Sequence, residues 1–227
     1  MEIRHLDFYC ERTSADFWAE PWNAWSNIFF FAAGLWALWT WFSWRKQTPQ
    51  SVKYRTLVLA GLLLLVGVGS FLFHTYANNY THLGDLIPIF IFTSAYLYHS
   101  ARHYMDFSAK ISWILLIGCV GSMFLIQKNV PTSVLNGSLL YAPPLLLMFY
   151  FAKGMRRSTY SKWAGMYGFA SWVFLFSLIF RTMDSAICES WPIGTHFIWH
   201  TLNGICLGTL LILALKVDRE KSMASRN

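Results

Sequence analysis

The sequence contains few charged residues for its length. Aspartate, glutamate, lysine and arginine make up only 13% of the 227 residues, whereas 56% are hydrophobic and 19% are aromatic. Ordinary soluble domains contain about 25% charged residues, so this composition excludes that class. The mean hydropathy of +0.39 instead indicates an integral membrane protein.

A cleavable signal peptide is also missing. The first residues are mixed and acidic rather than basic and then apolar, and no small-residue cleavage site follows them. We therefore expect the first hydrophobic run to be kept as a membrane span. The sequence shows no internal repeat, and the apolar runs leave no stretch for a soluble domain.

The basic residues do not indicate a nucleic-acid partner. Although the net charge is +7, lysine and arginine fall in short clusters between apolar runs, where they are typical of topology signals. We expect the partners to be the lipid bilayer and a membrane lipid, with no nucleic acid.

Seven nearly uncharged runs are each close to the roughly 17–25 residues that a spanning helix needs. They lie at about 22–44, 56–75, 85–101, 111–127, 133–152, 163–180 and 194–215. With the N-terminus outside, 14 basic residues fall on the cytoplasmic side and four outside. The predicted fold is an all-α membrane protein, a seven-transmembrane helix bundle with its N-terminus outside and its C-terminus cytoplasmic. The 14 cytoplasmic residues are Arg45, Lys46, Lys53, Arg55, Arg102, Lys110, Lys153, Arg156, Arg157, Lys162, Lys216, Arg219, Lys221 and Arg226.

This topology divides the chain into an outer segment, 1–21, a bundle, 22–216, and a cytoplasmic tail, 217–227. Pro88 is expected in the first turn of the third helix, where a missing backbone donor costs little. Pro143 and Pro144 are expected to kink the fifth helix.

Polar residues recur at helical spacing within the apolar runs. Ser70 and His74 stand four apart and share a helix face, as do His196 and His200, and Asp85 follows His74 after a short polar connection. The predicted topology places all five toward the outer side. Burying them without mutual compensation would be expensive, so we expect them to meet.

Three neutral imidazoles suit zinc, and three protein ligands leave a fourth position for water, which is the catalytic arrangement. His74, His196 and His200 are therefore predicted zinc ligands of a hydrolase. Asp85 would orient the water and accept its proton, and Ser70 would donate a hydrogen bond to a developing oxyanion. The alternatives are histidines that only hydrogen-bond between helices, and a serine that serves as a small residue at a helix contact.

These residues carry a resemblance to a known family. The S-x-x-x-H pattern with Asp eleven residues later, the late H-x-x-W-H, and the early C-E followed by E-P-W-N-A-W-S-N resemble the alkaline ceramidases. Their wider superfamily of seven-helix hydrolases also resembles the adiponectin receptors and the proteins that remodel GPI anchors. The resemblance implies a zinc site of the five residues above, with Asp85 contacting the water rather than the metal. It also implies cleavage of a ceramide-like amide to a fatty acid and a long-chain amine.

The resemblance further implies a calcium site in the outer segment. Asp7, Glu11 and Glu20 offer hard oxygen ligands, and Asn23 adds a carbonyl oxygen. The D-W expected before C-E is D-F-Y in this chain. Solvated acidic side chains at a membrane surface are the alternative.

Two further pairs of residues fall on the predicted outer side. Cys10 and Cys188 can form a disulfide in an oxidising compartment. Asp184 and Arg181, three residues apart, are expected to pair with each other.

Two other functions stay open at this stage. A receptor or scaffold would hold zinc structurally, and a lipid esterase or phospholipase would use the same fold for another bond. The short loops and the lack of organelle signals favour a bacterial inner membrane.

Overall fold

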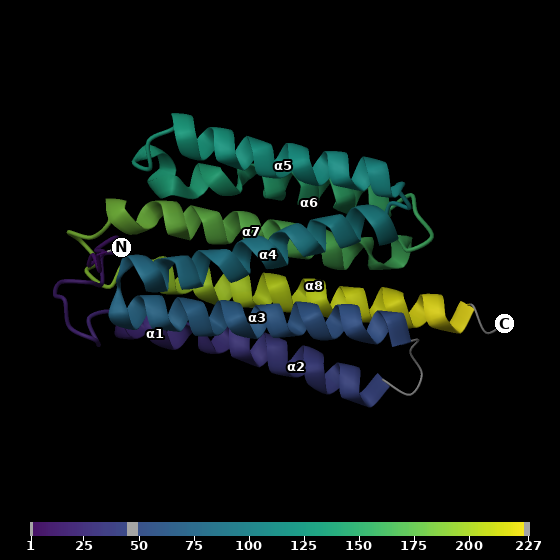
Figure 1. The fold of residues 1–227 in the computed structure, drawn as a ribbon, viewed down its shortest axis with the longest axis horizontal. Coiled ribbons are helices and arrows are strands. Elements are labelled where there is room, and N and C mark those ends of the chain that lie inside the picture. Colours follow the sequence, from purple (N-terminus) through teal and green to yellow (C-terminus); the bar gives the residue numbers. More distant parts are fainter. Residues whose placement is uncertain (1, 45–49, 225–227) are drawn as a thin grey trace.

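The computed structural model describes residues 2–44 and 50–224. Residues 1, 45–49 and 225–227, which include the predicted topology charges Arg45, Lys46 and Arg226 and the end of the predicted tail, lie outside the described residues. The described chain is helical, with one isolated bridge between His5 and Asn78. The helices lie roughly parallel in one bundle, and α1 and the C-terminal end of α8 lie toward its opposite ends (Figure 1).

The helices follow one another in the order that the hydropathy predicts. They are α1 (Pro21–Ser26), α2 (Ile28–Trp44), α3 (Gln50–Tyr76), α4 (Asn79–His103), α5 (Ala109–Asn129), η2 (Val134–Tyr141), α6 (Ala142–Met155), η3 (Ser161–Trp163), α7 (Ala164–Met183), η4 (Asp184–Ala186) and α8 (His196–Ala224).

Five stretches of the described chain are long and apolar enough to cross a membrane. They are Tyr54–Tyr76, Ala109–Asn129, Val134–Met155, Ser161–Ala186 and His196–Lys221. The protein is thus a multi-pass membrane protein. The α2 helix has only 17 residues, and α4 is long enough but carries polar side chains such as Asp85 and His99.

The α8 helix lies at the centre of the bundle and packs against α7, α2 and α3. In the most apolar window of α8, 67% of the residues are buried, compared with 11% for α5 at the edge (Figure 1). Side chains that α8 presents near its N-terminus therefore point into protein rather than toward the surroundings.

The α4 helix starts earlier than predicted. Asn78 accepts hydrogen bonds from the backbone of Tyr80 and Thr81, and the Thr81 hydroxyl accepts one from the backbone of Asn78, which completes a capping box. The prediction of a start near residue 85 was therefore wrong. Pro88 lies inside the helix instead of in its first turn.

The predicted kink at Pro143 and Pro144 was also wrong. Both prolines lie in the first turn of α6, where missing donors are tolerated. The break comes earlier, in η2, where Leu135, Asn136 and Gly137 adopt positive φ angles.

Candidate metal centre

His74 lies in the last turn of α3 and is held by the segment that precedes α1. Its Nδ1 atom is 2.6 Å from Oε2 of Glu20. Burial acts to raise the pKa of Glu20, but hydrogen bonds and attraction from His74, with hydrogen bonds from Arg12 and Asn23, outweigh it and lower this pKa. An ionised carboxylate only accepts hydrogen bonds, so Nδ1 of His74 must donate. In a neutral ring, the lone pair of His74 then lies on Nε2.

His196 and His200 lie one turn apart at the start of α8, which a buried aspartate caps. Asp184 Oδ1 accepts hydrogen bonds from the backbone of Thr195, at 2.6 Å, and of His196, at 2.9 Å. Gly194 precedes Thr195 and has a φ angle of +68°. A Cβ atom at position 194 would meet the Asp184 carboxylate. The chain can therefore enter α8 at this angle only with glycine at position 194.

His200 is oriented by the first helix of the chain. Its Nδ1 atom lies 3.1 Å from the carbonyl oxygen of Asn23 and 2.8 Å from Oγ of Ser26. Because a carbonyl only accepts, Nδ1 donates and Nε2 carries the lone pair. Two of the three rings are thus held so that Nε2 is available to a metal ion.

The three imidazoles converge. One ligand nitrogen of each lies within 4.8 Å of the others, and all three residues are buried. Within the described residues, Nε2 of His74 and Nδ1 of His196 are buried without a hydrogen-bond partner. Three convergent imidazoles, two of them hydrogen-bonded through the other ring nitrogen, fit a divalent metal ion of the zinc type.

Ser70 and Asp85 lie beside this cluster because α3 and α4 approach closely. A Cβ on Gly69 would meet the carbonyl oxygen of Gly84. That carbonyl lacks its usual helical donor because the residue four positions later is Pro88. Ser70 Oγ lies 3.3 Å from Nε2 of His200 and within hydrogen-bonding reach of Asp85.

Asp85 is buried, and in the described part of the chain its Oδ1 atom has no hydrogen-bond partner. A carboxylate oxygen in that state is normally completed by water or by a ligand. The Asp85 Oδ1 atom can therefore accept a hydrogen bond from a small molecule in the cavity.

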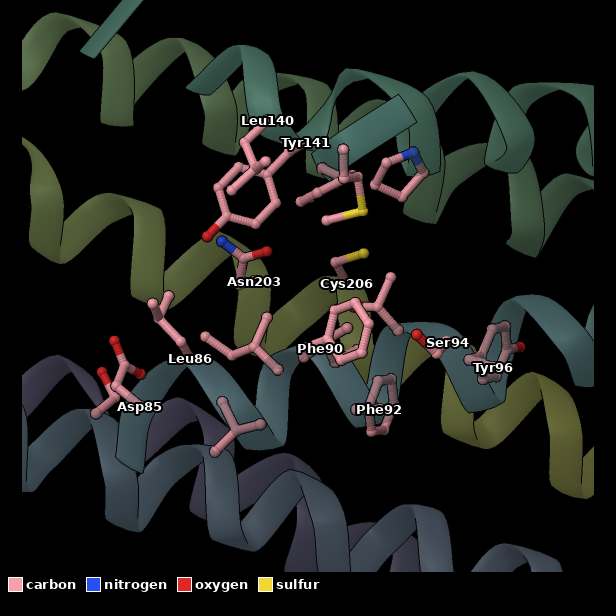
Figure 2. A pocket seen from close by; sticks show the side chains of 18 of the residues that line it. Asp85, Leu86, Phe90, Phe92, Ser94, Tyr96, Leu140, Tyr141, Asn203 and Cys206 are labelled. Atoms are coloured by element: carbon pink, nitrogen blue, oxygen red, sulfur yellow. The ribbon is translucent and has the colours of Figure 1, made fainter. Parts of the chain in front are cut away.

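A cavity of about 350 Å³ begins at these residues. Figure 2 shows Asp85 near one end of its lining and Tyr96 at the other. Most of the lining side chains are apolar and come from α4, α5, α6 and α8. Ile87 and Phe90 line the cavity yet are 52% and 45% exposed, so it opens on the surface of α4. The arrangement suits a molecule with a polar centre and a long apolar chain.

The outer segment covers the cluster. The Tyr9 ring stacks on His196 with the ring centroids 3.7 Å apart, and burial raises the pKa of Tyr9, so its phenol stays protonated. The Sγ atoms of Cys10 and Cys188 are bonded in a disulfide, which ties this cover to the chain before α8.

Of the four residues predicted to bind calcium, Glu11 and Glu20 have hydrogen-bond partners for their carboxylate oxygens. Glu11 accepts hydrogen bonds from the backbone of Trp22 and Asn23, at 2.6 and 2.8 Å, and so caps α1. Glu20 binds Arg12, Asn23 and His74. Asn23 Oδ1 is buried without a partner among the described residues, and Asp7 is exposed.

The expected pair of Arg181 and Asp184 was wrong. Arg181 binds the carbonyl of Asn136 and the hydroxyl of Ser138, and it lies over the rings of Tyr141 and Trp199. Asp184 instead caps α8. Asp184 lies 11 residues before Thr195, so no local spacing in the sequence signals that role.

Sequence reasoning also missed Arg12 and Ser26. Arg12 is one of the four basic residues on the predicted outer side, and nothing in its spacing relates it to Glu20. Ser26 is three residues before a phenylalanine run and looks like an ordinary helix serine. Only the packing of α1 against α8 makes it a partner of His200.

Two comparisons with known proteins bear on this geometry. A comparison with curated proteins found no significant match. A family model described as Ceramidase matches residues 6–226, which include every residue of the cluster and all the described helices. The chain belongs to the ceramidase family.

Proposed function

We propose that the protein is a zinc-dependent hydrolase that cleaves the amide bond of a ceramide-like lipid to a fatty acid and a long-chain amine. The observation that carries this proposal is the meeting of three imidazoles with the buried Asp85 carboxylate at one end of an apolar cavity. Membership of the ceramidase family supports the substrate class.

His74, His196 and His200 would hold the zinc. When bound, zinc supplies a Lewis acid that polarises a carbonyl group and makes water more acidic. Asp85 accepts a proton from the attacking water and returns it to the leaving amine nitrogen. Ser70 donates its hydroxyl proton in a hydrogen bond to the carbonyl oxygen as negative charge builds there. The apolar walls bind the acyl chain and exclude bulk water.

The proposed topology adds α2 and α4 to the five apolar stretches, because both lie alongside them in the same bundle (Figure 1). With seven spans, the 14 basic residues favour a cytoplasmic C-terminus. The opening beside Ile87 and Phe90 would then face the bilayer, from which a lipid can enter. The bacterial inner membrane stays a prediction.

The two alternative functions, a scaffold and a lipid esterase or phospholipase, assign different roles to Asp85. A receptor or scaffold with structural zinc has no use for a buried carboxylate oxygen that lacks a partner. An esterase or phospholipase would use the same residues on another bond, so matched amide and ester lipids distinguish it.

Asp85→Asn tests the proposal. The change keeps the size and removes the charge and basicity, so hydrolysis of an N-acyl lipid should fall roughly 10²–10⁴-fold. Zinc should remain, with at most the roughly 10–100-fold loss of affinity typical of residues around a metal ligand. Turnover and zinc content are measured on the same preparation. Asp106→Asn is the matched control, because Asp106 is exposed and its positive φ suits asparagine.

An Asp85→Asn protein that keeps its zinc and the parental rate would refute Asp85 as the base. No hydrolysis of any N-acyl lipid by the parent protein would favour the scaffold. Hydrolysis of the ester analogue alone would favour the esterase.

A further inference from the structure

The residues that would bind calcium do not fit that ion in this chain. Calcium takes about six to eight oxygen ligands. Both carboxylate oxygens of Glu11 accept backbone hydrogen bonds at the start of α1. Both of Glu20 are also engaged, Oε1 by Arg12 and Oε2 by Asn23 and His74. Among the four candidates, this leaves only the Asn23 amide oxygen and the exposed Asp7.

A different cation already lies among these oxygens. The guanidinium of Arg12 is ion-paired with Glu20, and the Arg12 side chain has no exposed surface. Its Nη1 atom donates to the carbonyls of Ser14, at 3.2 Å, and Asp16, at 3.3 Å. Its Nη2 atom donates to the carbonyl of His74, at 3.1 Å. One carboxylate and three carbonyls thus surround a fixed positive charge.

We propose that Arg12 takes the place of a bound divalent cation and acts as a positioning residue for the metal centre. It gathers the loop before α1 against the end of α3, and it fixes Glu20 so that Oε2 receives the Nδ1 proton of His74. A divalent ion placed there would face the guanidinium charge and would find the Glu20 oxygens engaged. The metal centre therefore forms without calcium.

This inference rests on the proposed zinc site but is tested without hydrolysis. Chelator-treated protein is titrated with calcium chloride to about 10⁻³ M, which reaches the weakest protein sites, with magnesium chloride as the control for ionic strength. We expect no retained calcium and no change in the melting temperature. One calcium ion retained per chain would overturn the proposal.

Variants of Arg12 test the positioning role. Arg12→Lys keeps the positive charge, whereas Arg12→Met keeps only the bulk of the side chain. Zinc affinity, measured by chelator competition, should therefore be higher in Arg12→Lys than in Arg12→Met. We expect a loss of roughly 10–100-fold in Arg12→Met and a smaller loss in Arg12→Lys. Arg4→Ala is the matched control, because Arg4 belongs to the same segment and is exposed.

Equal zinc affinities in Arg12→Met and the parent would overturn the positioning role. Equal losses in Arg12→Met and Arg12→Lys would show that packing rather than charge matters, and would overturn it too. If Arg12→Met fails to fold, Arg12→Lys and the calcium titration of the parent still decide. A parent protein that binds no zinc would instead refute the proposed function, whatever calcium does.

Discussion

Two of the buried polar clusters in the described part of the bundle use their hydrogen-bonding groups differently. The first is the histidine cluster of His74, His196 and His200. The second, which we name the tyrosine cluster, consists of Tyr96, Ser100, Tyr104 and Tyr167, and it is equally buried.

The tyrosine cluster satisfies itself. The Tyr96 hydroxyl donates to the carbonyl of Leu210 at 2.8 Å and lies 3.2 Å from the hydroxyl of Tyr104. Ser100 donates to the carbonyl of Tyr96 at 2.9 Å and lies 3.0 Å from the Tyr167 hydroxyl. A hydroxyl both donates and accepts, so such groups can complete one another.

The histidine cluster cannot do this. Its ring protons are directed outward, to Glu20 from His74 and to Asn23 and Ser26 from His200. This leaves Nε2 of His74 and Nε2 of His200 on the side of the cluster, together with Nδ1 of His196, and such a group could hold a metal ion. Burial of polar groups alone therefore does not identify a site, whereas an excess of inward acceptors does.

The largest effect is expected when one residue of the histidine cluster is removed. His200→Ala removes one of three ligands, so purified protein should lose most of its zinc and its hydrolysis. Zinc is measured by elemental analysis, with His5→Ala as the control because His5 is exposed. Full zinc occupancy in His200→Ala would refute the assignment of the site.

A smaller effect is expected when His200 loses one of the two hydrogen-bond partners of its Nδ1 atom. Ser26→Ala removes one partner of Nδ1 of His200 but leaves the carbonyl of Asn23 in place. Zinc affinity should fall roughly tenfold, the lower end of the range for such partners. Competition with a chelator measures it, and Ser43→Ala on the exposed face of α2 is the control. An unchanged affinity would mean that Asn23 alone orients the ring.

The sequence predicted the helices because they depend on short-range patterns, and it predicted the meeting of His74 with His196 and His200 because burying them apart would be expensive. Long apolar runs must be helical in a membrane, and the i, i+4 spacing of His196 and His200 places them on one face. The start of α4 was missed because the six residues before Asp85 are polar in part. Asn78 was nevertheless a readable cap.

What the sequence could not predict depends on contacts between distant segments. Arg12 meets the carbonyl of His74 across 62 residues, and Ser26 meets His200 across 174. No local spacing relates these positions. The approach of Gly69 to Gly84 likewise depends on two helices whose crossing point a single sequence does not fix.

The smallest expected effect concerns the tyrosine cluster, where the comparison predicts a cost in stability alone. Tyr167→Phe removes the hydroxyl that Ser100 contacts at 3.0 Å, while Ser100 keeps its bond to the carbonyl of Tyr96. Loss of one such hydrogen bond costs about 0.5–1.5 kcal/mol, which corresponds to a melting temperature roughly 2–4 °C lower per kcal/mol in a chain of this size. Tyr150→Phe, at an exposed position on α6, should show no shift and is the matched control. Zinc content and hydrolysis should match the parent protein in both variants, because each hydroxyl of the tyrosine cluster already has a hydrogen-bond partner. A Tyr167→Phe protein that loses zinc would show that the two clusters are coupled, and the distinction between a self-satisfied cluster and a cation site would fail.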